Sequence, residues 1–460
     1  MLSITAGRTR REFLTVGSLG LGGLAMSSLL GSRSVQAAAA APRLVTGKSV
    51  IFLFLQGGPS QHETFDPKED APEGIRTTTD VIDTSLPGVR FGARFPQLAT
   101  LAHKLTVVRS FQSTNGGHNI KPIVSDASLN ANIGSLYSRV VGSTRTDNGM
   151  PTNAVVFPEA ACDDVLKGKA RGDIASVGQL GSVYAPFIPG AGGQLQQNMR
   201  LNLSRDRFNG RTPLIAQLSS LSQQIDAAGE LGMIDHLQRQ AYQVLLTGGV
   251  ADALDLDTEN PKTIARYDTA QFADDRWRKA RRGAQGMYEG HARAIGKQLL
   301  MARRLCEAGC GYVTIHDGYD GVWDMHGDGN NLGIVDGMEA CGPALDHAVA
   351  AFIEDVEARG LSDKILLVVT GEMGRTPKVN KRGGRDHWAN STPLLLYGGG
   401  MPRGRVVGSS TRDGAEPSGD PLTPKHLVST ILHTLFDSGQ LRLVPGLDQI
   451  AKLTEHAPLV

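Results

Sequence analysis

The sequence lacks a surplus of charge of either sign, and this excludes several classes of partner. It carries 47 basic and 46 acidic side chains, which give a net charge of +1. Proteins that bind nucleic acids or anionic membranes usually gather basic residues into a patch or stripe. The chain has no such stripe, so we expect neither nucleic acid nor an anionic membrane as its partner.

Cysteine is also scarce, and the motifs of the common cofactor sites are missing. The four cysteines form no CxxC pair, which excludes the usual zinc and dithiol motifs. Cys306 and Cys310 fall one turn apart on an expected helix, which is awkward for a disulfide. We predict that they are buried small apolar residues, although one cysteine pair could oxidise in an exported chain. There is no GxGxxG at a strand–helix turn, so nicotinamide and nucleotide cofactors are not expected.

Long apolar runs are absent after residue 41, but the amino terminus has one of modest hydrophobicity. Arg10 and Arg11 precede an apolar stretch over 14–30, and the small-x-small pattern at 34–37 could be cut by a signal peptidase. This layout predicts a twin-arginine (Tat) signal peptide over 1–41. The alternatives are an amphipathic helix or a retained anchor, which the glycines of the stretch disfavour. We expect the Tat translocase to deliver the mature chain to the periplasm, the cell surface or the medium.

Short apolar segments alternate with amphipathic ones over 42–460, which we predict to be one large domain. The segments predicted as strands are 49–55, 105–109, 154–157, 312–315, 365–369 and 393–397. Helical patterns are clearest at 213–247, 276–308, 336–359 and 424–436. Strands apolar on both faces, alternating with helices, predict an α/β sandwich around a mostly parallel sheet. The polar, mostly helical stretch over about 190–300 is predicted to be an insertion or cap.

Six polar loops accompany these strands, and ligands in such folds bind beyond the carboxyl ends of the strands. The loops are 56–66, 110–118, 316–317, 323–326, 371–376 and 384–388. The Gly57–Gly58 pair in the first loop favours a sharp turn over a phosphate cradle, since no Gly-Lys-Ser/Thr follows. We therefore predict a functional site at this edge of the sheet.

Several of these loops carry residues suited to a divalent metal. Asp324 and His326 are two residues apart, so in an extended segment their side chains project to the same side. Carboxylate and imidazole groups are ligands for zinc or manganese. His387 is a third candidate ligand, and Glu372 is a further carboxylate candidate at a strand end. Asp386 could orient its neighbour His387. The alternative is that these residues form hydrogen bonds that hold the loops together.

Other residues of these loops suit acid–base, nucleophilic or anion-binding roles. Ser113 and Thr114 follow the second strand, where we expect a helix to begin. A hydroxyl group there could attack an anionic ester, or it could simply cap the helix. His118 is a candidate ligand or general acid–base. Arg375 could hold an anion, or it could pair with a carboxylate.

These motifs together resemble a bacterial family, domain of unknown function 1501. The resemblance lies in GGPSQHETFDPK, VRSF…GGH, VWDMHGD, VVTGEMGRTP and GRDHW and extends over roughly 48–440. Met373 occupies a position that is usually aromatic in the family, and Glu63 one that is usually Asp. The family is similar to the alkaline phosphatase and sulfatase superfamily. This similarity implies a three-layer α/β/α sandwich with a metal site at the strand ends.

The superfamily resemblance also implies roles for individual residues. Asp324, His326 and His387 would form one metal site, and Glu372 would stand where the second site has an Asp. Gln56 occupies the position of a metal-binding Asp.

Met373 occupies the position of a histidine ligand, so a complete two-metal site is not expected. Either one metal is bound, with His62, Glu63 or Asp66 supplying the missing ligands, or the fold has lost its catalysis.

Two functional hypotheses follow. The first is an exported hydrolase of phosphate or sulfate esters, sulfated polysaccharides among them, that uses zinc, manganese, calcium or magnesium. The second is a non-catalytic binding or assembly protein that reuses the fold, which Gln56 and Met373 favour. The spatial arrangement of Asp324, His326, Glu372 and His387 distinguishes them, because metal ligands must converge.

Overall fold

A computed structural model describes residues 44–190, 249–277, 286–319 and 321–460. The predicted signal peptide at 1–41 and the predicted helix at 213–247 lie outside these residues. No helix in the described ranges has both the length and the apolar character needed to cross a membrane.

The centre of the fold is a seven-stranded sheet with the strand order β11-β4-β10-β7-β1-β6-β5. All six predicted strands are present, and β11 is the one strand of this sheet that we did not predict. The strands are β1 (Ser49–Phe54), β4 (Leu105–Val108), β5 (Asn153–Val156), β6 (Tyr312–His316), β7 (Ile365–Thr370), β10 (Leu394–Gly398) and β11 (Arg405–Val407). Six strands share one direction, and β10 runs opposite to its neighbours β7 and β4.

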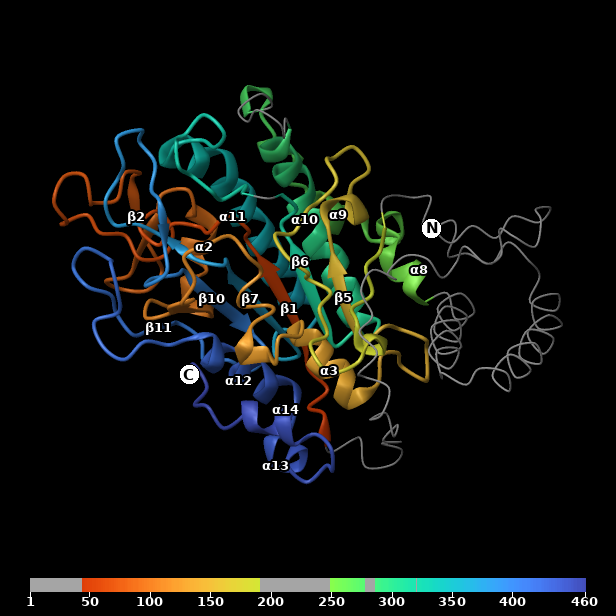
Figure 1. The fold of residues 1–460 in the computed structure, drawn as a ribbon. Helices are drawn as coiled ribbons and strands as arrows, with labels where there is room; N and C mark the ends of the chain where they lie inside the picture. The colour runs from red at the N-terminus through yellow and green to blue at the C-terminus, as the bar shows by residue number, and fades with distance from the viewer. Residues whose placement is uncertain (1–43, 191–248, 278–285, 320) are drawn as a thin grey trace.

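Each face of the sheet packs against its own layer of helices, which confirms the three-layer α/β/α sandwich. Along β1, Ile51 and Leu53 join one hydrophobic core, whereas Val50, Phe52 and Phe54 join the other. This alternation follows from the two-residue repeat of a strand. Figure 1 shows the two helical layers on opposite sides of the sheet. The first layer contains α2 (Pro96–Thr100), α8 (Gly249–Leu254), α10 (Met287–Glu307) and α11 (Ile334–Ala358), and the second contains α3 (Ile133–Val141), α12 (Pro424–Leu435) and α14 (Asp448–Leu453).

The described part of the stretch predicted as an insertion joins the main core. Residues 249–277 form short helical segments, among them α8 and α9 (Pro261–Tyr267), and α10 packs along α11. Residues 287–300 therefore belong to a layer of the sandwich rather than to a cap. Cys306 on α10 and Cys310 just beyond it are free and buried, as predicted.

The antiparallel direction of β10 determines which loops meet at the edge of the sheet. Leu394, the first residue of β10, is in register with Thr370 at the end of β7 and with Val108 at the end of β4. Phe54 at the end of β1 is likewise in register with Thr370 and with His316. The loop over 384–388 therefore reaches the predicted edge because it precedes β10, not because it follows a parallel strand.

Candidate metal centre

Four side chains from three loops converge at this edge of the sheet. His118 lies in the loop after β4, Asp324 and His326 lie in the loop after β6, and His387 lies in the short strand β9 (His387–Trp388). One ligand atom from each residue lies within 4.8 Å of the others, and this is the one such group of three or more among the described residues. Asp324, His326 and His387 were predicted as ligands. For His118 the sequence left two roles open, as a ligand or as a general acid–base.

The contacts within the group centre on the carboxylate of Asp324. Its Oδ1 lies 2.8 Å from His326 Nε2 and 3.2 Å from His387 Nε2, and its Oδ2 lies 3.0 Å from His118 Nε2. His326 Nε2 and His387 Nε2 are 3.0 Å apart. Two ring nitrogens that face each other beside one carboxylate oxygen are the donor atoms that a divalent cation would bind.

The opposite nitrogen of each ring faces an acceptor. Nδ1 of His118 lies 2.9 Å from Glu372 Oε1, Nδ1 of His326 lies 2.9 Å from Asp386 Oδ1, and Nδ1 of His387 lies 3.2 Å from the Gly116 carbonyl. Each ring therefore donates its hydrogen at Nδ1, which leaves the Nε2 lone pair for a metal. Metal-binding histidines are oriented in this way. The donor set of the structure thus fits a divalent ion.

Without a cation, the electrostatics of the group favour the protonated forms of His118 and His326. Burial disfavours the charged form of His118, but hydrogen bonds to Asp324 and Glu372 outweigh it and raise the pKa of His118 to about 9. The hydrogen bond to Asp324 likewise raises the pKa of His326. Burial would raise the pKa of Asp324, yet the three histidines and Arg375 outweigh it and lower the pKa. A metal ion could replace these protons as the partner of Asp324.

Glu372 lies outside the group of four. It is fully buried, and its Oε1 accepts a hydrogen bond from the Gly57 backbone at 2.9 Å while also contacting His118. In this geometry Glu372 orients His118. The sequence had instead predicted that Glu372 would contact a metal directly.

Arg375 is placed differently from the predicted anion contact. Its side chain is fully buried and donates to Asp324 Oδ1 at 2.6 Å. It also donates to four backbone carbonyls, those of Gly57, Gly58, Trp323 and Arg385. This geometry favours a structural role for Arg375, through Asp324, over binding of a substrate anion.

The hydroxyl groups after β4 lie on an irregular loop, so the expected helix start is wrong. Ser113 is fully buried, and its backbone N–H lies 3.3 Å from Thr392 Oγ1. Thr114 is exposed and has a φ of 57°, which is a strained conformation for a β-branched residue. The next helical segment begins at Asp126. No helix terminus therefore activates Ser113 or Thr114.

The first loop supplies close packing and no ligands. Gly57 has a φ of 119°, and a Cβ atom there would lie 2.5 Å from the Asp324 backbone nitrogen. Only glycine allows this approach, which confirms the predicted sharp turn. His62 Nε2 lies 2.8 Å from the Asp413 carbonyl, and Glu63 forms a fully buried ion pair with Arg385 at 2.9 Å.

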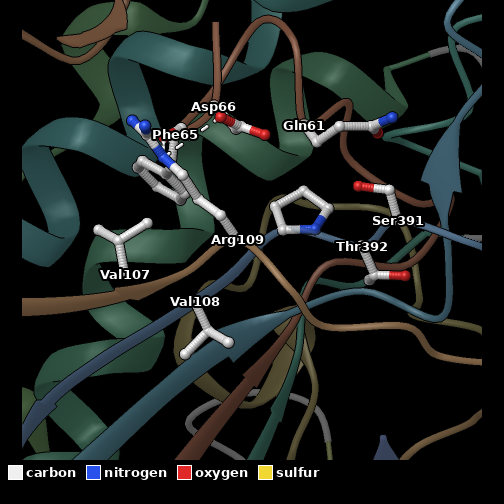
Figure 2. A pocket seen from close by; sticks show the side chains of 9 residues that line it. Gln61, Phe65, Asp66, Val107, Val108, Arg109, Ser391 and Thr392 are labelled. Atoms are coloured by element: carbon white, nitrogen blue, oxygen red, sulfur yellow. Dashed lines mark hydrogen bonds and ion pairs between the residues drawn. The ribbon is translucent and has the colours of Figure 1, made fainter. Parts of the chain in front are cut away.

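Asp66 forms part of a small pocket behind this loop, apart from the four convergent residues. Its carboxylate pairs with Lys68 at 3.0 Å. It also pairs with Arg109 at 3.3 Å, as Figure 2 shows. The pocket lies between the first loop, the end of β4 and the residues before β10. None of the three residues proposed to supply missing ligands thus joins the four convergent residues.

Gln56 at the end of β1 pairs with a neutral histidine instead of a metal. Its Oε1 accepts from His316 Nε2 at 2.6 Å, and His316 Nδ1 accepts from the Gly318 backbone at 3.0 Å. These contacts fix the neutral tautomer of His316, whose pKa burial lowers to about 3. The position at which the sequence resemblance implied a metal-binding Asp is therefore occupied by an uncharged pair here.

The buried neutral His316 predicts acid sensitivity. The unfolded chain protonates this group near pH 6.5, whereas the folded chain does so near pH 3. The unfolded state therefore binds more protons in this window, and the free energy of unfolding falls by about 1.4 kcal/mol per pH unit as the pH decreases. We expect His316→Gln to show a shallower decline than the wild type in urea unfolding between about pH 4 and 6. Identical slopes for both proteins would contradict this assignment.

Comparison with known proteins places this geometry in context. No curated protein matches the chain. Similar solved structures include the phosphonate monoester hydrolase SpPMH from Silicibacter pomeroyi, at 13% identity over 89% of this chain and 77% of that chain, with a TM-score of 0.35. The PsFucS1 sulfatase from Pseudoalteromonas sp. is 10% identical over 84% and 67%, with a TM-score of 0.32. Alkaline phosphatase from the Antarctic bacterium TAB5 is 11% identical over 84% and 98%, with a TM-score of 0.29.

At these values the likenesses carry no argument about activity. The family model described as "Protein of unknown function (DUF1501)" matches residues 47–458, which is most of the chain. The chain therefore belongs to the DUF1501 family.

Proposed function

We propose that the protein is an exported, metal-dependent hydrolase of phosphate or sulfate esters. The observation that carries the proposal is the convergence of three imidazole Nε2 atoms on Asp324, with every Nδ1 atom held by an acceptor. His118, Asp324, His326 and His387 would hold the ion. A bound divalent metal would polarise the ester oxygen and stabilise charge on the leaving or attacking oxygen.

The loop that carries His118 also carries an exposed hydroxyl-bearing residue. Thr114 is exposed, whereas Ser113 is buried. The same loop touches the centre twice more, because Gly116 accepts from His387 and the Asn115 side chain donates to the Glu372 carbonyl at 3.3 Å. We therefore assign the attack on the ester, or the orientation of an attacking water, to Thr114.

The proposal predicts turnover by the purified mature protein. Aryl phosphates, aryl sulfates and sulfated polysaccharides should be tested with zinc, manganese, calcium and magnesium. Thr114→Ala should lower kcat by about 100-fold or more, on the scale of a lost catalytic group. Ser113→Ala is the matched control and should change kcat much less, because its hydroxyl has no access to substrate. A wild-type protein that turns over none of these esters with any of the metals would contradict the hydrolase assignment.

Two observations favour a non-catalytic binding or assembly protein as the second candidate. Gln56 and His316 form an uncharged pair where the superfamily has a ligand, and Arg375 is buried away from any substrate. Such a protein would bind a sulfated glycan or a co-exported partner without turning it over. Binding of a sulfated polysaccharide in the absence of turnover would support this candidate.

A further inference from the structure

A buried chain of three polar side chains lies directly behind the metal centre and is not used by the proposed reaction. Trp323 immediately precedes Asp324, Asp317 follows β6, and His291 lies on α10. Each of the three residues has at most 1% of its surface exposed. They thus connect the loop of the metal ligands to the helical layer under the sheet.

Short contacts join the three residues. Trp323 Nε1 donates to Asp317 Oδ2 at 2.5 Å, and His291 Nδ1 lies 2.6 Å from Asp317 Oδ1. His291 Nε2 lies 3.2 Å from the Cys341 carbonyl on α11. Both ring nitrogens face acceptors, so the ring carries a hydrogen on each and forms an ion pair with Asp317. Burial disfavours this charge, but the carboxylate outweighs it and raises the pKa of His291.

The backbone of Trp323 is hydrogen-bonded to Gln56 and to Arg375, which is also the partner of Asp324. Its N–H donates to the Gln56 carbonyl at 3.2 Å, and its carbonyl accepts from Arg375 Nη2 at 3.2 Å. Arg375 Nη2 in turn donates to Asp324 Oδ1 at 2.6 Å. The indole therefore anchors the peptide from which Asp324 extends.

The energetics of the buried His291–Asp317 pair favour a role in positioning Asp324 over a role in stability. A buried ion pair contributes little net stability, because desolvation of both charges offsets their attraction. A buried carboxylate that binds the residue next to a metal ligand does, however, restrict where that ligand lies. We propose that His291 and Asp317, through the indole of Trp323, are positioning residues that fix Asp324 for the metal. This inference rests on the metal site of the proposed function.

The test removes the indole N–H and measures metal affinity. Trp323→Phe keeps an aromatic ring but cannot donate to Asp317, so Asp324 is less restricted. The Kd for zinc, measured by competition with a chromophoric chelator, should rise about 10-fold, the lower end of the effect of groups that orient ligands. The ligand-field spectrum of the cobalt(II) protein should change as well. Asp317→Asn is a second variant, which keeps an acceptor for the indole and should give the smaller effect.

Tyr267→Phe is the matched control for a purely structural role. It removes a buried hydroxyl that donates to Asp355 Oδ2 at 3.0 Å. Asp355 lies near the carboxyl end of α11, whereas the loop of Asp324 and His326 precedes the amino end of this helix. It should lower stability without changing the zinc Kd or the cobalt spectrum. A Trp323→Phe protein with the wild-type Kd and spectrum, or an equal loss of affinity in Tyr267→Phe, would overturn the inference but leave the metal site standing. A folded wild-type protein that binds no metal would overturn both.

Discussion

Replacement of Asp324 and His387 by alanine should reduce the metal content of the purified protein from about one ion per chain to nearly none. The reason is geometric, because Asp324 contacts all three imidazoles and His387 supplies one of the two facing Nε2 atoms. Two ligands would remain, too few to hold a divalent ion in a site that ordinarily needs three or four. Plasma mass spectrometry of wild-type and variant protein measures the change directly, and ester turnover should disappear with the metal.

The control for this experiment removes the same two residue types from the surface. His103 and Asp363 are exposed and lie outside the metal centre. The His103→Ala/Asp363→Ala variant should therefore keep the wild-type metal content. Equal metal content in wild type, site variant and surface variant would mean that the ion is bound elsewhere. A well-folded wild-type protein without metal would favour the binding-protein alternative.

Arg375→Met should lower the free energy of unfolding by about 3–5 kcal/mol. The guanidinium is buried between Asp324 and four carbonyls, so its removal leaves these acceptors without their donor. Denaturant unfolding of the metal-free protein measures the loss. Arg375→Lys should recover only part of it, because one ammonium group cannot reproduce the planar set of donors.

The same experiment distinguishes the structural role of Arg375 from the anion contact that its sequence context suggested. If Arg375 bound the substrate anion from an open cleft, Arg375→Met would raise KM and leave the unfolding midpoint unchanged. Arg382 is exposed and serves as the matched control. It lies in the same turn as Asn380, whose side chain donates a hydrogen bond to the His326 carbonyl. Arg382→Met should change stability by no more than about 0.5 kcal/mol.

The sheet was predictable from the sequence because its strands are buried on both faces and therefore appear as continuous apolar runs. Each of the six predicted strands is present within a residue or two at either end. The direction of β10 was not predictable, because an apolar run of five residues has no direction. The edge strand β11, partly exposed, gave no such run.

The site was predictable in its location but not in the division of roles. Asp324, His326 and His387 carry the residue types and spacing of ligands, and they do converge. Which of His118 and Glu372 joins the convergent group depends on the path of an irregular loop, which no periodicity encodes. No pattern in the sequence indicates that Arg375 is buried either. His291 lies within a helical pattern, where a single histidine gives no signal of an ion pair with Asp317.

The register of β10 has a consequence for how such a site could change over evolution. Thr370 and Leu394 are paired neighbours in the sheet, so the segment over 371–393 leaves and returns at the same point. This single connection between β7 and β10 supplies Glu372, Arg375 and His387. Because the two ends of this segment are adjacent, a different segment of this kind would fit between β7 and β10 without altering the strand order. The residues of the proposed metal site would then change by replacement of one contiguous segment, while the rest of the sandwich stays unchanged.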